Sequence, residues 1–372
     1  MSRYSWACGR CPTPATPART RPLHASVRGV TVNLVERAHE IADTVLFPAA
    51  LAVDRTGHVP DSHWETLADA GLYGIAAPTA AGGPGLGLPE IIEILETMAG
   101  GCLATAFTWV QHHGMLASLI ATGNHALHDE VVPDAIAGRV RGGVAYAGAV
   151  PVPPRMCAQQ VPGGWRLSGH APFVSGWGII DVIQISAGDI ESGDIVAGLV
   201  SAEVQPGITT VIAQPLFVAD ASQTVALEID DLLIPDDRIV SRVRRADFMA
   251  NQNFGSRLNA TLPIGLVVRC ARLLDDAGET AAATALRTEA DAIRVRLDAG
   301  LGDASTLLRA RADGCELAVR ASGAVVAARG GPALLRSDPA QLLARSALFT
   351  LVAASRPELK RSLVNHMSHT QE

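Results

Sequence analysis

The chain has 372 residues, 48% of them hydrophobic and 18% charged, with a formal net charge of −7 at pH 7. This composition is typical of a globular protein and excludes a disordered one, and the length allows two or three domains. The net negative charge argues against nucleic acid as a partner. The sequence contains no run of 18 apolar residues, so no membrane span is predicted. Six scattered cysteines are expected to be reduced thiols in a cytoplasmic protein.

The first 30 residues differ in composition from the rest. They hold five arginines, four prolines and no carboxylate, since the first acidic residue is Glu36. Arginine-rich starts can be organellar transit peptides, but prolines would break the amphipathic helix that such peptides form. We expect residues 1–30 to be a disordered tail, or a start codon assigned too early. Cys8 and Cys11 form a Cys-x-x-Cys pair, but no second pair or histidine cluster follows, so we expect no metal site there.

Residues 31–140 have the pattern of a helical domain, because apolar side chains recur every three or four residues. Pro60 stands immediately before one of the helices, where a proline is tolerated. The expected helices cover residues 34–45, 61–70, 90–99 and 105–121.

Two features of this domain resemble ligand sites. The glycine-rich segment 82–87 lacks the Gly-Lys-Ser/Thr ending of a phosphate-binding loop and follows a helix instead of a strand, so we interpret it as a turn between helices. His112 and His113 are adjacent, and on a helix their side chains point about 100° apart, which prevents joint binding of one metal ion. We expect a helix-capping or half-buried pair.

Residues 141–240 contain short strand-like runs separated by glycine, proline and aspartate turns. Segment 163–178 reads as strands with turns, and the apolar run 179–185 follows it. Segment 224–229 then alternates between apolar and polar residues and ends at the turn-rich segment 230–240.

Residues 241–372 are again helical. Apolar stripes run over 258–273 and 308–326, and Pro339 and Pro357 each begin a further helix. Several such stripes imply a bundle. The predicted fold class is mainly α with a central β-domain: a helical domain, a β-barrel and an α-bundle in chain order.

With this domain order, the chain resembles the acyl-CoA dehydrogenase family over about residues 32–367. The segments that carry the resemblance are Leu72-Tyr-Gly-Ile, Gly82-Gly-Pro-Gly-Leu-Gly, Gly164-Trp-Arg-Leu-Ser-Gly, Phe173-Val-Ser-Gly, Pro235-Asp-Asp-Arg-Ile-Val, Arg257, Gly330-Gly, Pro339 and Arg345. The resemblance implies a flavoprotein oxidoreductase that performs α,β-dehydrogenation of an acyl-CoA thioester in lipid metabolism. It also implies FAD bound between the β-domain and the bundle of a homotetramer.

The resemblance assigns the cofactor site. Phe173, followed by Val174, matches the aromatic residue beside the flavin, and Ser175 matches a hydroxyl that hydrogen-bonds the ring. A reduced flavin needs such a group and an apolar wall that excludes water. Gly330 and Gly331 match glycines where a neighbouring subunit's backbone approaches the FAD pyrophosphate.

The catalytic positions depart from the family. There a glutamate removes the α-proton of the thioester, because a weakly acidic proton needs a positioned base; the matching position here is Ala353. Some members carry the glutamate beside the arginine at the substrate end of the bundle, which Arg257 matches, but that position is Ser256. Glu358 is expected to be an exposed first-turn carboxylate, with a relocated base as the alternative.

Several cofactor contacts of the family are also replaced. Tyr146-Ala-Gly-Ala-Val-Pro stands where the family has Thr-Glu-Pro-Gly over the flavin, and the glutamine before Gly-Gly is Ala327. The Arg…Phe-Gly pair that grips the pyrophosphate has no counterpart in 275–300. We still expect FAD, held by the remaining backbone contacts.

Three functions are consistent with these residues. The first is an acyl-CoA dehydrogenase-like flavoenzyme with an unrecognised base. The second is a non-catalytic subunit of a mixed oligomer with a complete paralogue. The third is a flavin-dependent monooxygenase of the same fold, which needs no α-proton base.

Overall fold

The computed structural model describes residues 33–354 and 357–368. The expectations for residues 1–30, including the Cys8 and Cys11 pair, lie outside these ranges. Across the described helices, none combines the length and the apolar character needed to cross a bilayer.

Within the described residues, six α-helices precede the sheet. They are α1 (Leu34–Ile41), α2 (Phe47–Thr56), α3 (Asp61–Asp69), α4 (Leu88–Gly101), α5 (Leu103–Ile120) and α6 (His125–Ile136). Local signals set their starts: the Asn33 side chain accepts the Val35 N–H at the start of α1, and the Glu90 carboxylate accepts the Gly87 N–H at the start of α4. The glycine-rich segment 82–87 lies between α3 and α4, as predicted. Sequence analysis missed α6, because Pro133 lies inside it.

The central domain is one eight-stranded sheet. Its strands are β1 (Gly142–Ala145), β2 (Met156–Val161), β3 (Gly164–Val174), β4 (Val182–Asp189), β5 (Ile195–Ser201), β6 (Ile208–Ala213), β7 (Val225–Pro235) and β8 (Ile239–Val243). The order is β6-β7-β3-β2-β4-β5-β8, and β1 pairs with β4. The β1–β4 and β2–β4 pairs are parallel and the others antiparallel.

Two boundaries predicted for this domain are wrong. The alternating strand does not end at Ile229, because β7 continues to Pro235. Asp231, with φ of 57°, forms a bulge whose N–H donates to the Ser168 hydroxyl, and this turns Leu232 back into the core. The apolar run 179–185 is also not all strand, since β4 begins only at Val182.

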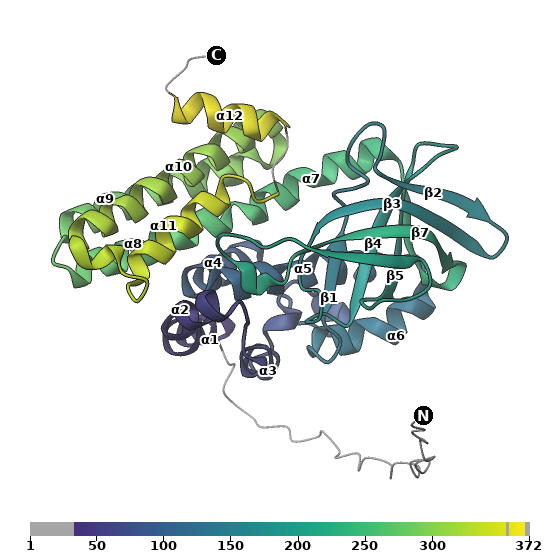
Figure 1. The fold of residues 1–372 in the computed structure, drawn as a ribbon, viewed down its shortest axis with the longest axis horizontal. Helices are drawn as coiled ribbons and strands as arrows, with labels where there is room; N and C mark the ends of the chain where they lie inside the picture. The colour runs from purple at the N-terminus through teal and green to yellow at the C-terminus, as the bar shows by residue number, and fades with distance from the viewer. Residues whose placement is uncertain (1–32, 355–356, 369–372) are drawn as a thin grey trace, which may run out of the picture. The chain divides into compact units, whose positions relative to one another are not determined.

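After the sheet, the described part of the chain has six α-helices, which form the bundle (Figure 1). They are α7 (Arg245–Asn259), α8 (Thr261–Asp276), α9 (Thr280–Ala299), α10 (Ala304–Arg329), α11 (Pro339–Thr350) and α12 (Pro357–Met367). Helix α10 contacts α8, α9, α11 and α12, so it forms the centre of the bundle. The predicted fold class, mainly α with a central β-domain, is confirmed.

Close contacts join the blocks of the described chain. Helices α4 and α8 cross at such close range that a Cβ on Gly265 would lie 2.1 Å from the Glu96 carbonyl oxygen. Arg345 on α11 donates to both carboxylate oxygens of Asp54 on α2, at 3.0 and 2.6 Å, and to the Phe217 carbonyl in the β6–β7 segment at 2.8 Å. These contacts fix how the helical blocks pack against each other.

Candidate functional site

The end of β3 turns an aromatic side chain outward. Phe173 has φ of 54° and is 67% exposed, whereas Val174 beside it is fully buried and pairs with Val225. A positive φ is rare for a bulky residue and is found at sites where surrounding structure enforces it. The register shift between Ala171 and Val174 produces this turn. The predicted flavin neighbour therefore lies on the surface of the chain, with its ring open to a ligand.

Ser175 belongs to a row of buried hydroxyls. Its Oγ lies 2.8 Å from Thr224 Oγ1, which lies 2.8 Å from Ser222 Oγ. The Gly176 N–H donates to the Ser222 carbonyl at 2.7 Å, so the turn after β3 and the segment before β7 are tied together. Phe173, Val174 and Ser175 thus lie at one turn, and Thr224 and Ser222, which were not predicted, lie beside Ser175.

Helix α5 packs against this turn and against β1. A Cβ on Gly176 would lie 3.3 Å from the Thr108 methyl group, and the Gly142 N–H donates to His112 Nδ1 at 3.1 Å. The expectation of a capping or half-buried histidine pair is wrong: His112 and His113 are both buried in the middle of α5. Burial lowers the pKa of His112 to about 4 and that of His113 well below its usual 6.5.

The position that matches the family base lies just after α11 and is apolar. The Ala353 methyl group is buried in a cluster with Phe349 and Trp109. Its carbonyl accepts a hydrogen bond from the buried Arg311 of α10. Neither neighbour in the chain, Val352 or Ala354, carries a carboxylate. The structure therefore places a fixed backbone carbonyl and a methyl group at this position.

The alternative base positions carry no suitable group either. Ser256 is buried on α7 and offers a hydroxyl. Glu358 is exposed in the first turn of α12, where the helix dipole stabilises its negative charge. No described residue at the positions matched to the family base is a buried carboxylate.

Arg257 is enclosed in the bundle and paired. It is 1% exposed, and its Nε donates to Asp298 Oδ1 of α9 at 2.6 Å. Its Nη1 has no hydrogen-bond partner among the described residues.

Glu96, which was not singled out from the sequence, is a buried carboxylate near Arg257. Its pKa is raised, because the effect of burial exceeds the opposing effects of Arg294 and Arg257. Its ion pair with Arg294, at 2.7 Å, identifies Glu96 as a structural link between α4 and α9.

The glycines assigned to the pyrophosphate lie at the end of α10. Gly330 has φ of 65° and caps that helix, and a Cβ on Gly330 or Gly331 would meet no described atom within 4 Å. The loop that replaces Thr-Glu-Pro-Gly is anchored by Arg245 of α7, which donates to the carbonyls of Ala149, Val150 and Pro151. The backbone at Gly330 and Gly331 is exposed, whereas Arg245 occupies the carbonyls of the loop.

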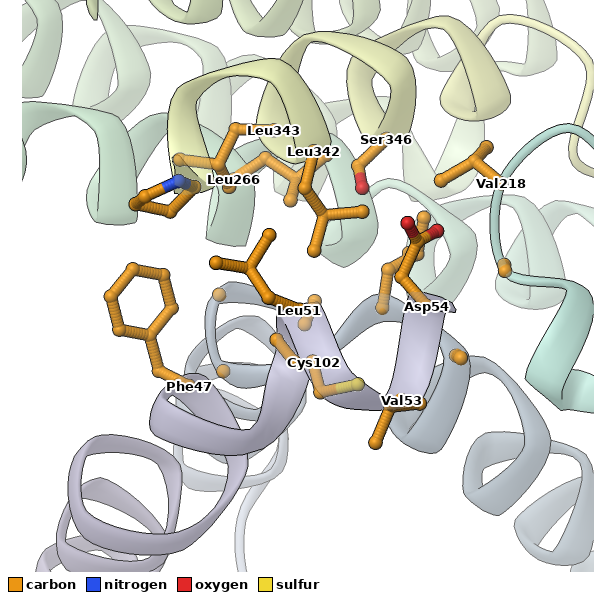
Figure 2. Close-up of a pocket in the computed structure, with 18 residues that line it drawn as sticks. Phe47, Leu51, Val53, Asp54, Cys102, Val218, Leu266, Leu342, Leu343 and Ser346 are labelled. Atoms are coloured by element: carbon orange, nitrogen blue, oxygen red, sulfur yellow. The ribbon is translucent and has the colours of Figure 1, made fainter. Parts of the chain in front are cut away.

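A small pocket lies elsewhere, between α2 and α11 (Figure 2). Its walls are mainly apolar, and the Asp54 carboxylate and the Ser346 hydroxyl point into it. Arg345 already binds both oxygens of Asp54, and none of the predicted site residues lines the pocket. We interpret it as part of the junction between helices.

Comparison with known proteins supports the resemblance to the acyl-CoA dehydrogenase family. Residues 31–139 match the acyl-CoA dehydrogenase N-terminal domain. Isovaleryl-CoA dehydrogenase of Oryza sativa subsp. japonica is 22% identical over 246 residues, which cover 63% of this chain and 60% of that protein. The p-hydroxyphenylacetate 3-hydroxylase oxygenase component of Acinetobacter baumannii is 28% identical over 171 residues, 43% of this chain and 36% of that protein.

The structural comparison agrees. Glutaryl-coenzyme A dehydrogenase, solved as a glutaryl-CoA complex, superposes with a TM-score of 0.79 at 17% identity, covering 91% of this chain and 95% of that one. The matched regions span only 60% to 62% of the first curated relatives. The domain match, the relatives and the shared fold lead to one conclusion: residues 31–139 match the acyl-CoA dehydrogenase N-terminal domain, and the chain has the acyl-CoA dehydrogenase fold.

Proposed function

We propose that this protein is an acyl-CoA dehydrogenase-like flavoprotein oxidoreductase that binds FAD at the end of β3 and acts on an acyl-CoA thioester. The observation that carries the proposal is the turn at Phe173, where an exposed aromatic ring at positive φ stands beside the buried Ser175 hydroxyl. Backbone strain of this kind is maintained where a ligand uses it. The family relationship supplies the reaction class.

The residues present fit the flavin ring better than the phosphates. Phe173 offers an apolar wall, and the hydroxyl row ending at Ser175 has one more proton than it has internal hydrogen bonds to make. Three arginines of α9 are all engaged by acids: Arg287 by Asp275, Arg294 by Glu96 and Arg296 by Asp313. The pyrophosphate would therefore rest on the backbone at Gly330 and Gly331, supplied by a second chain, and we expect weak binding in a homotetramer or mixed oligomer.

The chain's own residues would bind and orient the substrate without removing its α-proton. When bound, FAD supplies an acceptor for two electrons. Ala353 and Ser256 cannot take a proton, and the absence of a general base typically lowers a rate by about 10² to 10⁴. Fast α,β-dehydrogenation would need a residue other than Ala353 or Ser256 to remove the α-proton.

The presence of Ala353 at the matched base position also favours a second candidate function. A flavin-dependent monooxygenase needs no α-proton base, and the similarity to the 3-hydroxylase oxygenase component supports that possibility. A non-catalytic subunit paired with a complete paralogue would also tolerate Ala353. A flavin reductase encoded next to this gene would favour the monooxygenase, and a complete paralogue would favour the subunit.

Titration of the purified protein with FAD tests the proposal through quenching of flavin fluorescence. We expect quenching in the wild type and about three- to tenfold weaker binding in Phe173→Ala, because an aromatic contact with the ring is lost. Phe217→Ala is the matched control, since Phe217 is equally exposed, at 60%, in another segment. A colourless wild type that shows no quenching would exclude the proposed cofactor.

A further inference from the structure

Three buried hydroxyls stand in series behind the turn at Phe173. Ser175, Thr224 and Ser222 are 4%, 7% and fully buried, and adjacent oxygens are 2.8 Å apart. Each hydroxyl has one proton to donate. Three protons and two internal hydrogen bonds leave one O–H that must point out of the series.

The neighbouring atoms determine which of the three hydroxyls donates its proton outside the series. At the Ser222 end, no other hydrogen bond to its Oγ is present within the described residues, and the residue is fully buried. An O–H left there, or at Thr224 between its two neighbours, would be a buried donor without an acceptor, which is the costly arrangement. Ser175 is also buried, at 4% exposed, but it belongs to the same turn as the exposed Phe173 ring, where a bound ligand would accept its O–H.

We propose that Thr224 and Ser222 are positioning residues that direct the proton of Ser175 outward, as a donor to an unprotonated ring nitrogen of the bound cofactor. Ser222 donates to Thr224, Thr224 donates to Ser175, and Ser175 donates to the ligand. Each donated bond makes the next hydroxyl a stronger donor, because hydrogen bonds in a chain polarise one another. This inference rests on the proposed function, which places the flavin ring at Phe173, Val174 and Ser175.

Paired titrations with FAD and 5-deazaFAD test it, because 5-deazaFAD has a C–H group where the oxidised ring of FAD has an acceptor nitrogen. We expect the wild type to prefer FAD. Thr224→Val keeps the shape of the side chain and removes the middle hydroxyl. It should weaken FAD binding by less than the roughly three- to tenfold that loss of a whole hydrogen bond causes, because Ser175 keeps its own proton but Thr224 no longer polarises it, and it should leave 5-deazaFAD binding unchanged.

Two further variants make the test independent of the folding of Thr224→Val. Ser175→Ala should abolish the preference for FAD, and Ser222→Ala should reduce it by a smaller factor. Thr122→Val, which removes a buried hydroxyl that donates to the Val240 carbonyl, should change neither affinity.

The outcomes separate this inference from the proposed function. A wild type that binds neither flavin overturns both. A wild type that binds FAD, with variants that weaken both flavins equally or neither, overturns the hydroxyl series and leaves the flavoprotein assignment intact.

Discussion

Arg311 holds the backbone carbonyl of Ala353, the residue that the resemblance matches to the family's catalytic glutamate. The arginine is 1% exposed on α10, and it also reaches the Ala354 carbonyl at 3.4 Å. Ala354 has φ of 46°, so the chain leaves α11 in a left-handed turn. A charged side chain thus fixes the backbone at a position whose own side chain is only a methyl group.

Arg311→Leu should destabilise the protein by about 2 to 4 kcal/mol, because two carbonyls would lose a buried charged donor. Urea unfolding measures the change as a lower midpoint. Arg309→Leu on the same helix is the control, since Arg309 is exposed, and it should change stability by less than about 0.5 kcal/mol. Equal stability of the two variants would show that Arg311 does not support the turn.

Gly265→Ala should destabilise the crossing of α4 and α8. The new Cβ would lie 2.1 Å from the Glu96 carbonyl oxygen, a backbone atom that cannot move away cheaply. We expect a loss of at least about 1 to 3 kcal/mol, as for overpacking in a core. Gly323→Ala on α10 has open space for its Cβ and should instead stabilise by about 0.5 to 1 kcal/mol. Thermal unfolding should show a lower midpoint temperature for Gly265→Ala and a higher one for Gly323→Ala. A midpoint that is not lowered in Gly265→Ala would contradict the close crossing of α4 and α8.

Stability should fall as the pH drops below about 6.5, because His112 and His113 are buried as neutral rings. Their folded pKa values are lowered, to about 4 for His112, while the unfolded chain binds protons near 6.5. The unfolded state then gains protons first, and each histidine removes up to about 1.4 kcal/mol per pH unit until its folded pKa is reached. His113→Phe keeps the edge-to-face contact with Trp109. It should reduce the slope of unfolding free energy between pH 6.5 and 5 by about one proton, and an unchanged slope would contradict the assignment.

Sequence periodicity was sufficient for the three-block architecture, because long apolar stripes and proline-marked helix starts repeat in α8, α10 and α11. Shorter elements were missed. Strand β1 has four residues, two of them glycine, and α6 contains Pro133, so neither has a clear pattern. The extension of β7 past Ile229 depends on a bulge at Asp231, and two consecutive aspartates normally mark a turn.

The site was predictable only as far as single residues match a family. Phe173, Val174 and Ser175 are adjacent in sequence, so their grouping needed no structure. Thr224 and Ser222 are distant in sequence from Ser175 and meet it only because β7 pairs with β3. The burial of Arg257 against Asp298 on α9 is likewise set by helix packing, which no local pattern encodes.

We infer that this chain lacks the base for α,β-dehydrogenation at Ala353, the position matched to the family's glutamate. The direct measurement is anaerobic mixing of the FAD-loaded protein with a saturated acyl-CoA while the flavin absorbance is followed. We expect very slow bleaching in the wild type, lower by about 10² to 10⁴ than a base-assisted reaction. Ala353→Glu should accelerate it where the thioester still binds, and Ala353→Gln is the control of similar size without a base. Rapid bleaching of the wild-type flavin would contradict the claim and show that another residue, with Glu358 the first candidate, removes the α-proton.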